Sequence, residues 1–159
     1  MSVKSRRRHA LPIVLGALTF AATAHAQHHT VVAGDAVKWG PAPPSLPPGA
    51  EAAVLLGDPG KDGPFVLRLK FPAGYTIPPH RHSKAEHVTV IAGGFAMGSG
   101  EAVDRGARPR PAGSFVAIPA GTPHYAFVVG ETVVQINGVG PFDIRYVNGG
   151  DDPRLKKAQ

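Results

Sequence analysis

The sequence predicts an all-β protein, a sandwich or barrel of many short strands. Short runs rich in β-branched and aromatic residues recur along the chain, separated by turn-forming residues that include 20 Gly and 17 Pro. No segment repeats its apolar residues at the 3.6-residue period of an amphipathic helix. The 159 residues, 43% of them apolar, are enough to bury one core, so we expect a single domain.

The expected strands follow one another from the middle of the chain to near its end. Each is a short apolar, β-branched or aromatic run that stops at Gly, Pro or a polar turn. Their ranges are 53–56, 65–71, 87–91, 95–98, 114–118, 125–129, 132–136 and 144–147.

A proline-rich arm over residues 27–49 precedes the first expected strand. Its last part, residues 40–49, is dominated by Pro and Gly. Proline fixes φ and lacks an N–H donor, so this part can be neither helix nor central strand and should run extended. We expect Trp39, just before it, to pack the arm against the domain.

The first 26 residues have the three-part pattern of a secretory signal peptide. Basic residues at 4–8 precede an apolar stretch over 11–22, and Ala24-His25-Ala26 forms a small-x-small cleavage site. The apolar stretch is too short to span a membrane. We therefore expect cleavage before Gln27 and a periplasmic or secreted protein without a membrane anchor. Ser5-Arg6-Arg7 leaves both Sec and twin-arginine export open.

The charge balance argues against a nucleic-acid partner. Four of the 17 basic residues lie in the expected signal peptide, which has no acidic residue, so the mature chain carries 13 basic against 11 acidic groups. No long basic run remains to track a phosphate backbone. The chain also has no cysteine, which excludes disulfides and thiolate metal ligands.

Three histidines and one glutamate form the candidate functional site. His80, His82 and Glu86 lie close together in the sequence, and His124 follows 38 positions later. Imidazoles and a carboxylate are donors for a divalent transition metal. Alternate residues of a strand point the same way, so His80 and His82 can reach one ion. We predict a mononuclear metal site; the alternative is a set of ordinary barrel histidines.

Glu86 needs a change of chain direction to join these histidines. On a straight strand it would lie about 13 Å beyond His82, so we expect a turn over 83–85 and a hairpin that returns Glu86 to the site. A helix would also align the two side chains, but Pro78-Pro79 and the β-branched run after the site disfavour it. The same alternation turns His87 away, toward the surface.

The ligand spacing resembles the two sequence motifs of the cupin superfamily. The first motif-like segment contains Gly74, His80, His82, Glu86 and Gly93, and the second contains Gly113, Pro119, Gly121 and His124. The resemblance covers about residues 50–147 and leaves a polar tail over 148–159. It implies a double-stranded β-helix, a small jelly-roll barrel whose interior holds the metal.

Two details refine this resemblance. Where the second cupin motif commonly ends in Asn, this chain has Val128, so an apolar wall would replace a polar contact. The segments around Trp39, 55–59 and 71–74 are also more loosely similar to single-domain cupins related to the sensor half of anti-sigma factors.

The donor set leaves the metal and the function open. Four protein ligands would close a tetrahedral zinc site, whereas Fe(II), Mn(II) or Ni(II) would keep two positions for substrate and O₂. An open site favours a small-molecule enzyme of dioxygenase type, and the alternative is a non-catalytic metal- or ligand-binding or sensing module. A separate copper or nickel site at Gln27-His28-His29 would require a free amine on Gln27.

The expected pocket is apolar, and the expected assembly is a homodimer. The residues expected to line the pocket are Met97, Tyr125, Phe127, Val128, Gln135 and Asn137. Strand alternation places Arg68, Lys70 and Arg145 toward solvent, which argues against a phosphate or sugar-nucleotide ligand. The resemblance and the need to protect edge strands together predict pairing between subunits.

Overall fold

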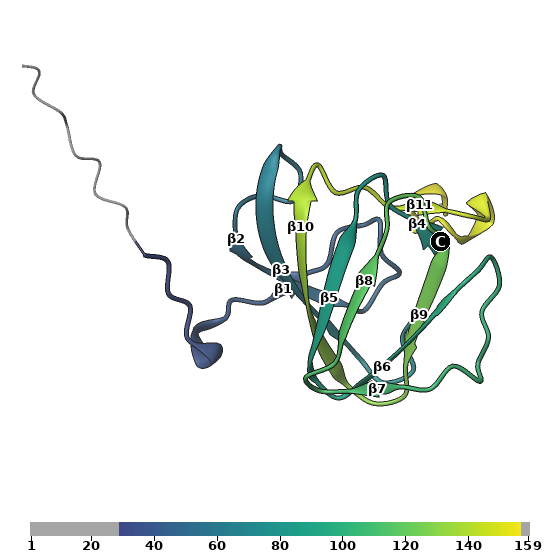
Figure 1. Cartoon of the computed structure of the whole chain (residues 1–159), viewed down its shortest axis with the longest axis horizontal. Helices are drawn as coiled ribbons and strands as arrows, with labels where there is room; N and C mark the ends of the chain where they lie inside the picture. Colours follow the sequence, from purple (N-terminus) through teal and green to yellow (C-terminus); the bar gives the residue numbers. More distant parts are fainter. Residues whose placement is uncertain (1–28, 157–159) are drawn as a thin grey trace, which may run out of the picture.

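Two antiparallel β-sheets pack against each other in the computed structural model, which describes residues 29–156 (Figure 1). The first sheet has the strand order β1-β2-β3-β10-β5-β8, and the second has the order β11-β4-β9-β6-β7. The strands are β1 Gly40–Pro41, β2 Glu51–Leu56, β3 Gly63–Phe71, β4 Thr76–Arg81, β5 Glu86–Ala92, β6 Gly94–Ser99, β7 Arg110–Pro111, β8 Phe115–Ile118, β9 His124–Val128, β10 Thr132–Gly140 and β11 Arg145–Tyr146. Three short 3₁₀ helices complete the described elements: η1 Gly34–Ala36, η2 Gly149–Asp151 and η3 Pro153–Leu155. The expected signal peptide lies outside the described residues.

The core lies between the sheets and follows the period-2 rule. On β3 the inward residues Phe65, Leu67, Leu69 and Phe71 are each no more than 6% exposed, while the residues between them are partly accessible. Because every second side chain points inward, β3 contributes one apolar face to the barrel interior. The all-β prediction is confirmed.

The strand predictions differ from the structure at β1, β4 and β7, which are absent from the expected set. β4 was hidden by Pro78 and Pro79, which have no N–H to donate to a ladder. The β4–β9 pairing shifts register between Ile77 and His80, so both prolines fall at this irregularity. β10 also extends to Gly140, four residues beyond its expected end, because it pairs with β3 along its whole length.

The expected turn after His82 is present, but the expected hairpin was wrong. The chain bends at Ser83 and Lys84, and Glu86 then begins β5. β4 and β5 belong to different sheets and do not pair. The turn therefore carries the chain from one sheet to the other and leaves Glu86 beside His82 and His124.

The proline-rich arm is docked at the edge of the first sheet. β1 pairs with β2 through Gly40 and Ala52, and the Ala42 amide donates to the Ala50 carbonyl at 3.1 Å. The Lys70 ammonium lies 4.9 Å from the centre of the Trp39 ring, which attaches the arm to β3. The described residues include no helix long and apolar enough to cross a membrane.

Candidate metal centre

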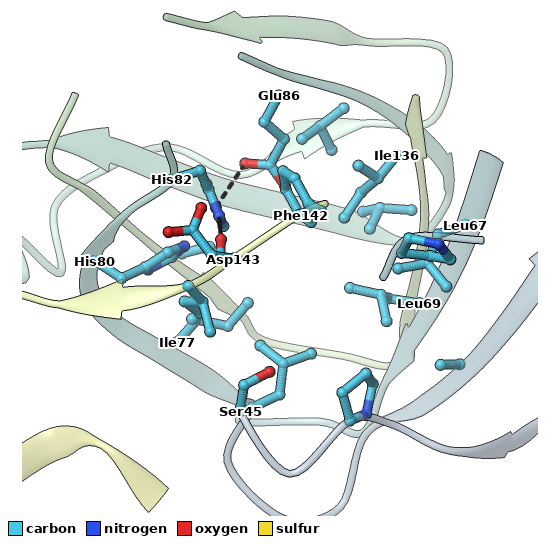
Figure 2. A pocket seen from close by; sticks show the side chains of 18 of the residues that line it. Ser45, Leu67, Leu69, Ile77, His80, His82, Glu86, Ile136, Phe142 and Asp143 are labelled. Carbon is cyan, nitrogen blue, oxygen red and sulfur yellow. Dashed lines mark hydrogen bonds and ion pairs between the residues drawn. The ribbon is translucent and has the colours of Figure 1, made fainter. Parts of the chain in front are cut away.

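The structure brings the four candidate ligands together at one end of the barrel interior. His80 lies near the end of β4 and His82 just after it, while Glu86 and His124 begin β5 and β9. His80 and His124 are directly paired across the β4–β9 ladder. All four are buried, between 2% and 6% exposed. Figure 2 shows His80, His82 and Glu86 grouped at the same side of the cavity.

Backbone carbonyls fix the orientation of the three imidazoles. The Nδ1 atom of His80 lies 2.7 Å from the Pro78 carbonyl, and that of His124 lies 2.9 Å from the Thr122 carbonyl. The Nδ1 atom of His82 is hydrogen-bonded to the Asp143 carbonyl. A carbonyl only accepts, so each Nδ1 carries the proton and each Nε2 presents a lone pair. This is the tautomer in which Nε2 is a metal ligand.

The inward nitrogens are placed so that they can share one cation. Donor atoms of His80, His82 and His124 all lie within 4.8 Å of one another. The Nε2 atoms of His82 and His124 are buried without a hydrogen-bond partner. The Oε2 atom of Glu86 is 3.4 Å and 3.3 Å from them. Lone pairs and a carboxylate facing one another repel unless a positive charge lies between them, so these residues fit a metal ion.

The electrostatics of the cluster point the same way. Burial, and after it the neighbouring His124, lowers the pKa of His80 to about 3, so this imidazole stays neutral. Burial would raise the pKa of Glu86, but His124 and His82 together lower it to about 2, so the carboxylate stays charged. Against the effect of burial, Glu86 raises the pKa of His82. A neutral His80 imidazole and an ionised Glu86 carboxylate are protonation states that metal binding requires, and the raised pKa of His82 shows that Glu86 favours a positive charge beside that ring.

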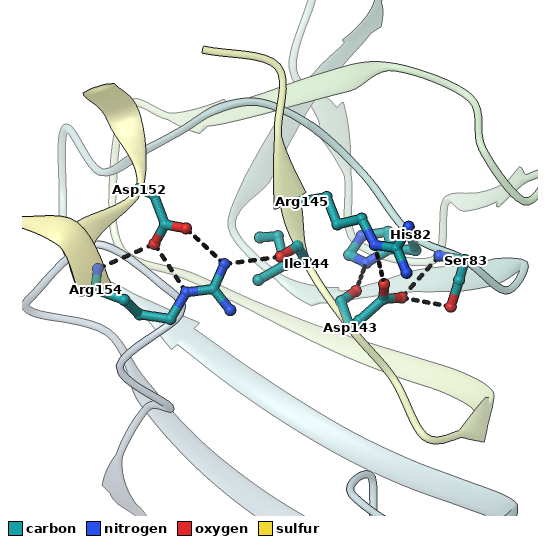
Figure 3. Close-up of polar contacts among 7 residues, drawn as sticks. All are labelled: His82, Ser83, Asp143, Ile144, Arg145, Asp152 and Arg154. Atoms are coloured by element: carbon teal, nitrogen blue, oxygen red, sulfur yellow. Dashed lines mark hydrogen bonds and ion pairs between the residues drawn. The ribbon is translucent and has the colours of Figure 1, made fainter. Parts of the chain in front are cut away.

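A loop between β10 and β11 supports His82 from behind. The Phe142 ring stacks on the His82 ring with centroids 4.3 Å apart. The Asp143 carboxylate accepts hydrogen bonds from the Ser83 amide at 2.7 Å and hydroxyl at 2.6 Å, and it pairs with Arg145 at 2.7 Å (Figure 3). Burial raises the pKa of Asp143, but these partners outweigh it and lower the pKa. The carboxylate thus anchors the backbone carbonyl that orients His82.

The C-terminal tail fixes the next residue of the same loop. The Arg154 guanidinium donates to the Ile144 carbonyl at 3.0 Å and pairs with Asp152 at 2.7 Å (Figure 3). Ile144 is 8% exposed and its side chain lines the cavity. Sequence reasoning missed this loop because its contacts with residues 82 and 83 span about 60 positions, and no local pattern marks it.

An apolar cavity of about 480 Å³ opens beside the candidate ligands. Its walls include Ala52 and Val54 of β2 and some of the inward residues of β3, β5, β9 and β10, together with Ile77, Phe95 and Met97. Three groups of loop residues complete it: 41, 43, 45 and 46 from the arm, 58–60, and 142–144. Figure 2 shows Leu67, Leu69 and Ile136 turned into this space.

Of the six residues expected to line the cavity, only Met97 does so. Tyr125 and Phe127 alternate with the inward His124 and Ala126, so they face outward and form a second cluster with Ala96. Val128 points into the main core, but its side chain does not reach the cavity wall.

Gln135 and Asn137 also lie away from the cavity, on the outer face of the first sheet. They alternate with the inward Val134 and Ile136 of β10. Gln135 accepts a hydrogen bond from the Arg68 guanidinium at 3.2 Å, and its amide donates to Asn137 at 3.3 Å. Arg68 thus lies on the outer face, as do the exposed His87 and the half-buried Lys70. Arg145 is exposed as well.

Solved structures share the fold at low sequence identity. An acetylacetone dioxygenase from Acinetobacter johnsonii has a TM-score of 0.60 and 18% identity, covering 85% of this chain and 88% of its own. The polyketide cyclase RemF from Streptomyces resistomycificus has a TM-score of 0.60 and 21% identity. The match covers 79% of this chain and 90% of RemF. An RmlC-like cupin from Shewanella frigidimarina has a TM-score of 0.55 and 13% identity. The match covers 71% of this chain and 92% of the cupin. These likenesses confirm the cupin jelly roll and no more.

The family is given by a match over most of the sequence. No curated protein matches this chain significantly. The model of the ChrR cupin-like domain matches residues 27–143. This match confirms both the cupin similarity and the looser similarity to the anti-sigma-factor type of cupin. This chain therefore belongs to the family of ChrR cupin-like domains.

Proposed function

We propose that this protein is a metal-dependent enzyme of dioxygenase type that acts on a small apolar molecule. One observation carries the proposal: three imidazoles with their Nε2 atoms turned inward and one carboxylate converge, fully buried, beside an apolar cavity of about 480 Å³. A cavity of this size is typical of sites that bind drug-sized ligands. The same arrangement would supply a metal site and room for a substrate next to it.

Four residues would hold the metal: His80, His82, Glu86 and His124. Nitrogen and carboxylate donors suit Fe(II), Mn(II), Ni(II) and Zn(II), and Glu86 would offset one of the two positive charges. A six-coordinate metal would polarise a substrate bound through two oxygens and would support its reaction with O₂. Fe(II) is our first choice, because a closed tetrahedral zinc site would make no use of the adjacent cavity.

The other cavity residues bind the substrate and exclude water rather than move protons. Outside the ligand set, the carboxylates on the described cavity wall belong to Asp58 and Asp143. Asp58 pairs with Lys61 at 3.1 Å, and Asp143 is held by Ser83 and Arg145. A substrate that ionises easily, such as the enol of a 1,3-dicarbonyl compound or a catechol, needs no further base. Two oxygens at one end of such a molecule would face the metal.

A second candidate is a non-catalytic module that binds or senses a metal or small ligand. The lack of a free acid or base on the described cavity wall favours it. The fold does not choose between the two, since an acetylacetone dioxygenase and a polyketide cyclase both share it.

Oxygen consumption separates the two candidates. The full chain, loaded with Fe(II), is mixed with pentane-2,4-dione, longer 1,3-diones or catechol while dissolved O₂ is recorded. We expect uptake that depends on substrate and stops in His124→Ala, whereas His87→Ala, which alters an exposed histidine, keeps the full rate. Ligand binding without uptake for any of these compounds would favour the binding module.

A further inference from the structure

We infer that residues 41–47, here called the wall segment, close the cavity opposite the metal and that Leu46 limits the length of the bound molecule. The ligand class is then a largely hydrocarbon molecule with its oxygen donors at one end and an alkyl or aryl tail at the other. The inference rests on the proposed function only for the end of the molecule that carries the oxygen donors, because the metal would bind that end. The tail site depends on the wall segment and the cavity.

The wall segment bridges the two sheets where the sandwich has an open edge. β1 is the edge strand of the first sheet, and β11 is the edge strand of the second. The Tyr146 hydroxyl, on β11, donates to the Ser45 carbonyl at 2.7 Å, and the Tyr75 hydroxyl donates to the Pro47 carbonyl. Hydrogen bonds from the second sheet and the turn before it therefore fasten a segment that begins on the first sheet.

The wall segment faces the cavity with small and apolar groups. Pro41, Pro43, Ser45 and Leu46 all line it, and Leu46 also packs against the main core. Figure 2 shows Ser45 on the far side of the cavity from Glu86. Leu46 follows Ser45 and also lines the cavity, so the inference places the tail end of the bound molecule at these two residues.

The surfaces between these two ends are hydrocarbon. Leu67, Leu69, Ile77, Val88 and Ile136 all line the cavity with hydrocarbon side chains. A polar ligand tail would lose its water there without gaining partners, so an apolar tail is favoured. Each methylene transferred from water should strengthen binding by up to about fourfold until the tail reaches Leu46.

The test is a binding measurement that does not need activity. The full chain, with and without Fe(II), is titrated with the neutral fluorescent probe N-phenyl-1-naphthylamine, which has no metal-binding group. The probe is then displaced by 1,3-diones with increasing alkyl tails. Leu46→Trp should fill the tail site, and Leu46→Ala should lengthen it. Val129→Trp adds the same ring at a position that is 72% exposed and lies off the cavity.

We expect the probe to bind both metal states and displacement to improve with tail length up to a limit. Leu46→Trp should weaken probe binding at least tenfold, Val129→Trp should leave it unchanged, and Leu46→Ala should move the limit to longer tails. If Leu46→Trp does not unfold cooperatively, the variant is not properly folded. The test then depends on whether Leu46→Ala moves the limit to longer tails. Equal probe binding in both Trp variants, or an unchanged limit in Leu46→Ala, would overturn the inference.

The two proposals fail in different ways. If the protein binds the probe and the long diones as expected but consumes no O₂, the tail site stands and the dioxygenase proposal fails. If it consumes O₂ at a rate independent of tail length and of Leu46→Trp, the enzyme stands and the tail site is wrong.

Discussion

At the scale of single residues, the candidate site is defined by where each histidine places its proton. Backbone carbonyls of Pro78, Thr122 and Asp143 hold the Nδ1 protons, which leaves three Nε2 lone pairs facing one carboxylate. Asp143 differs from the other two because its own side chain is fixed by Ser83 and Arg145. The orientation of His82 therefore depends on a carboxylate outside the ligand set.

Replacing Asp143 with asparagine should weaken metal binding. Asp143→Asn removes the charge that pairs with Arg145 and weakens the bonds from Ser83, so the loop that orients His82 loosens. Outer partners of metal ligands typically contribute 10- to 100-fold to affinity, and we expect a loss of about tenfold or more. Competition with a chromogenic chelator measures it.

Glu101→Gln is the matched control, because it makes the same kind of change in an exposed ion pair, 3.3 Å from Arg81. An Asp143→Asn affinity equal to that of Glu101→Gln would show that the carboxylate has no part in positioning His82.

The four candidate ligands could be selected from the sequence, because alternation aligns His80 with His82 and the wider spacing of the set resembles the two cupin motifs. The residues behind them could not. Phe142 and Asp143 approach His82 only because β10 and β11 close the barrel about 60 positions later, and no sequence period records that approach. Contacts between residues so far apart in the sequence can be predicted only once the fold is known.

At the scale of elements, alternation decides which face of a strand reaches the cavity. Applied strictly to β9 and β10, it places His124, Ala126, Val134 and Ile136 inside. The expected pocket set instead included Tyr125, Phe127, Gln135 and Asn137 from the opposite faces of these strands, and the structure places these residues off the cavity. The register relative to the inward His124 and Val134 was the better guide, because one buried residue fixes the face of its whole strand.

The turn between β5 and β6 depends on a glycine. Gly93 has φ of +78°, and a Cβ there would collide with the Glu131 carbonyl and with Thr132. Gly93→Ala should therefore lower the free energy of unfolding by about 1–3 kcal/mol. Urea denaturation measures the loss.

Gly130→Ala gives the comparison, because a Cβ at Gly130 would meet nothing within 4 Å. Its free energy of unfolding should change by no more than about 0.5 kcal/mol. Equal losses in the two variants would mean that the Gly93 conformation is not required.

At the scale of the whole molecule, the all-β class and most strands were predictable, because turn residues and short β-branched runs are independent of distant contacts. The division into two sheets was not. The expected hairpin at Ser83 is instead a crossing between sheets, and local sequence does not distinguish these two uses of a turn. Strand β4 was missed for a different reason: Pro78 and Pro79 lack the N–H groups of a regular strand, and the pairing of β4 with β9 is irregular at these residues.

Metal should stabilise the folded protein. A ligand that binds only the native state at 100 times its Kd adds about 2.7 kcal/mol, because unfolding must first release it. For a chain of this size that corresponds to a rise in Tm of about 5–10 °C. Calorimetry before and after dialysis against a chelator measures the shift, and restoring the metal should reverse it. An unchanged Tm after verified metal removal would contradict a site that couples to folding.

Export remains a prediction, since residues 1–26 lie outside the described part of the chain. We expect the protein recovered from the periplasm or medium of its expressing cell to begin at Gln27, as the small-x-small pattern predicts. Intact-mass measurement reads the N-terminus directly. A product that keeps Met1 and stays in the cytoplasm would contradict the signal peptide.

The central claim is that His80, His82, Glu86 and His124 hold one divalent metal ion. Its most direct test is elemental analysis of the protein purified without chelator or histidine tag, beside the double variant His80→Ala/His124→Ala. We expect about one iron, manganese, nickel or zinc per chain in the natural sequence and almost none in the variant. Metal retained by the double variant, or none in the natural protein even after incubation with each ion, would contradict the account.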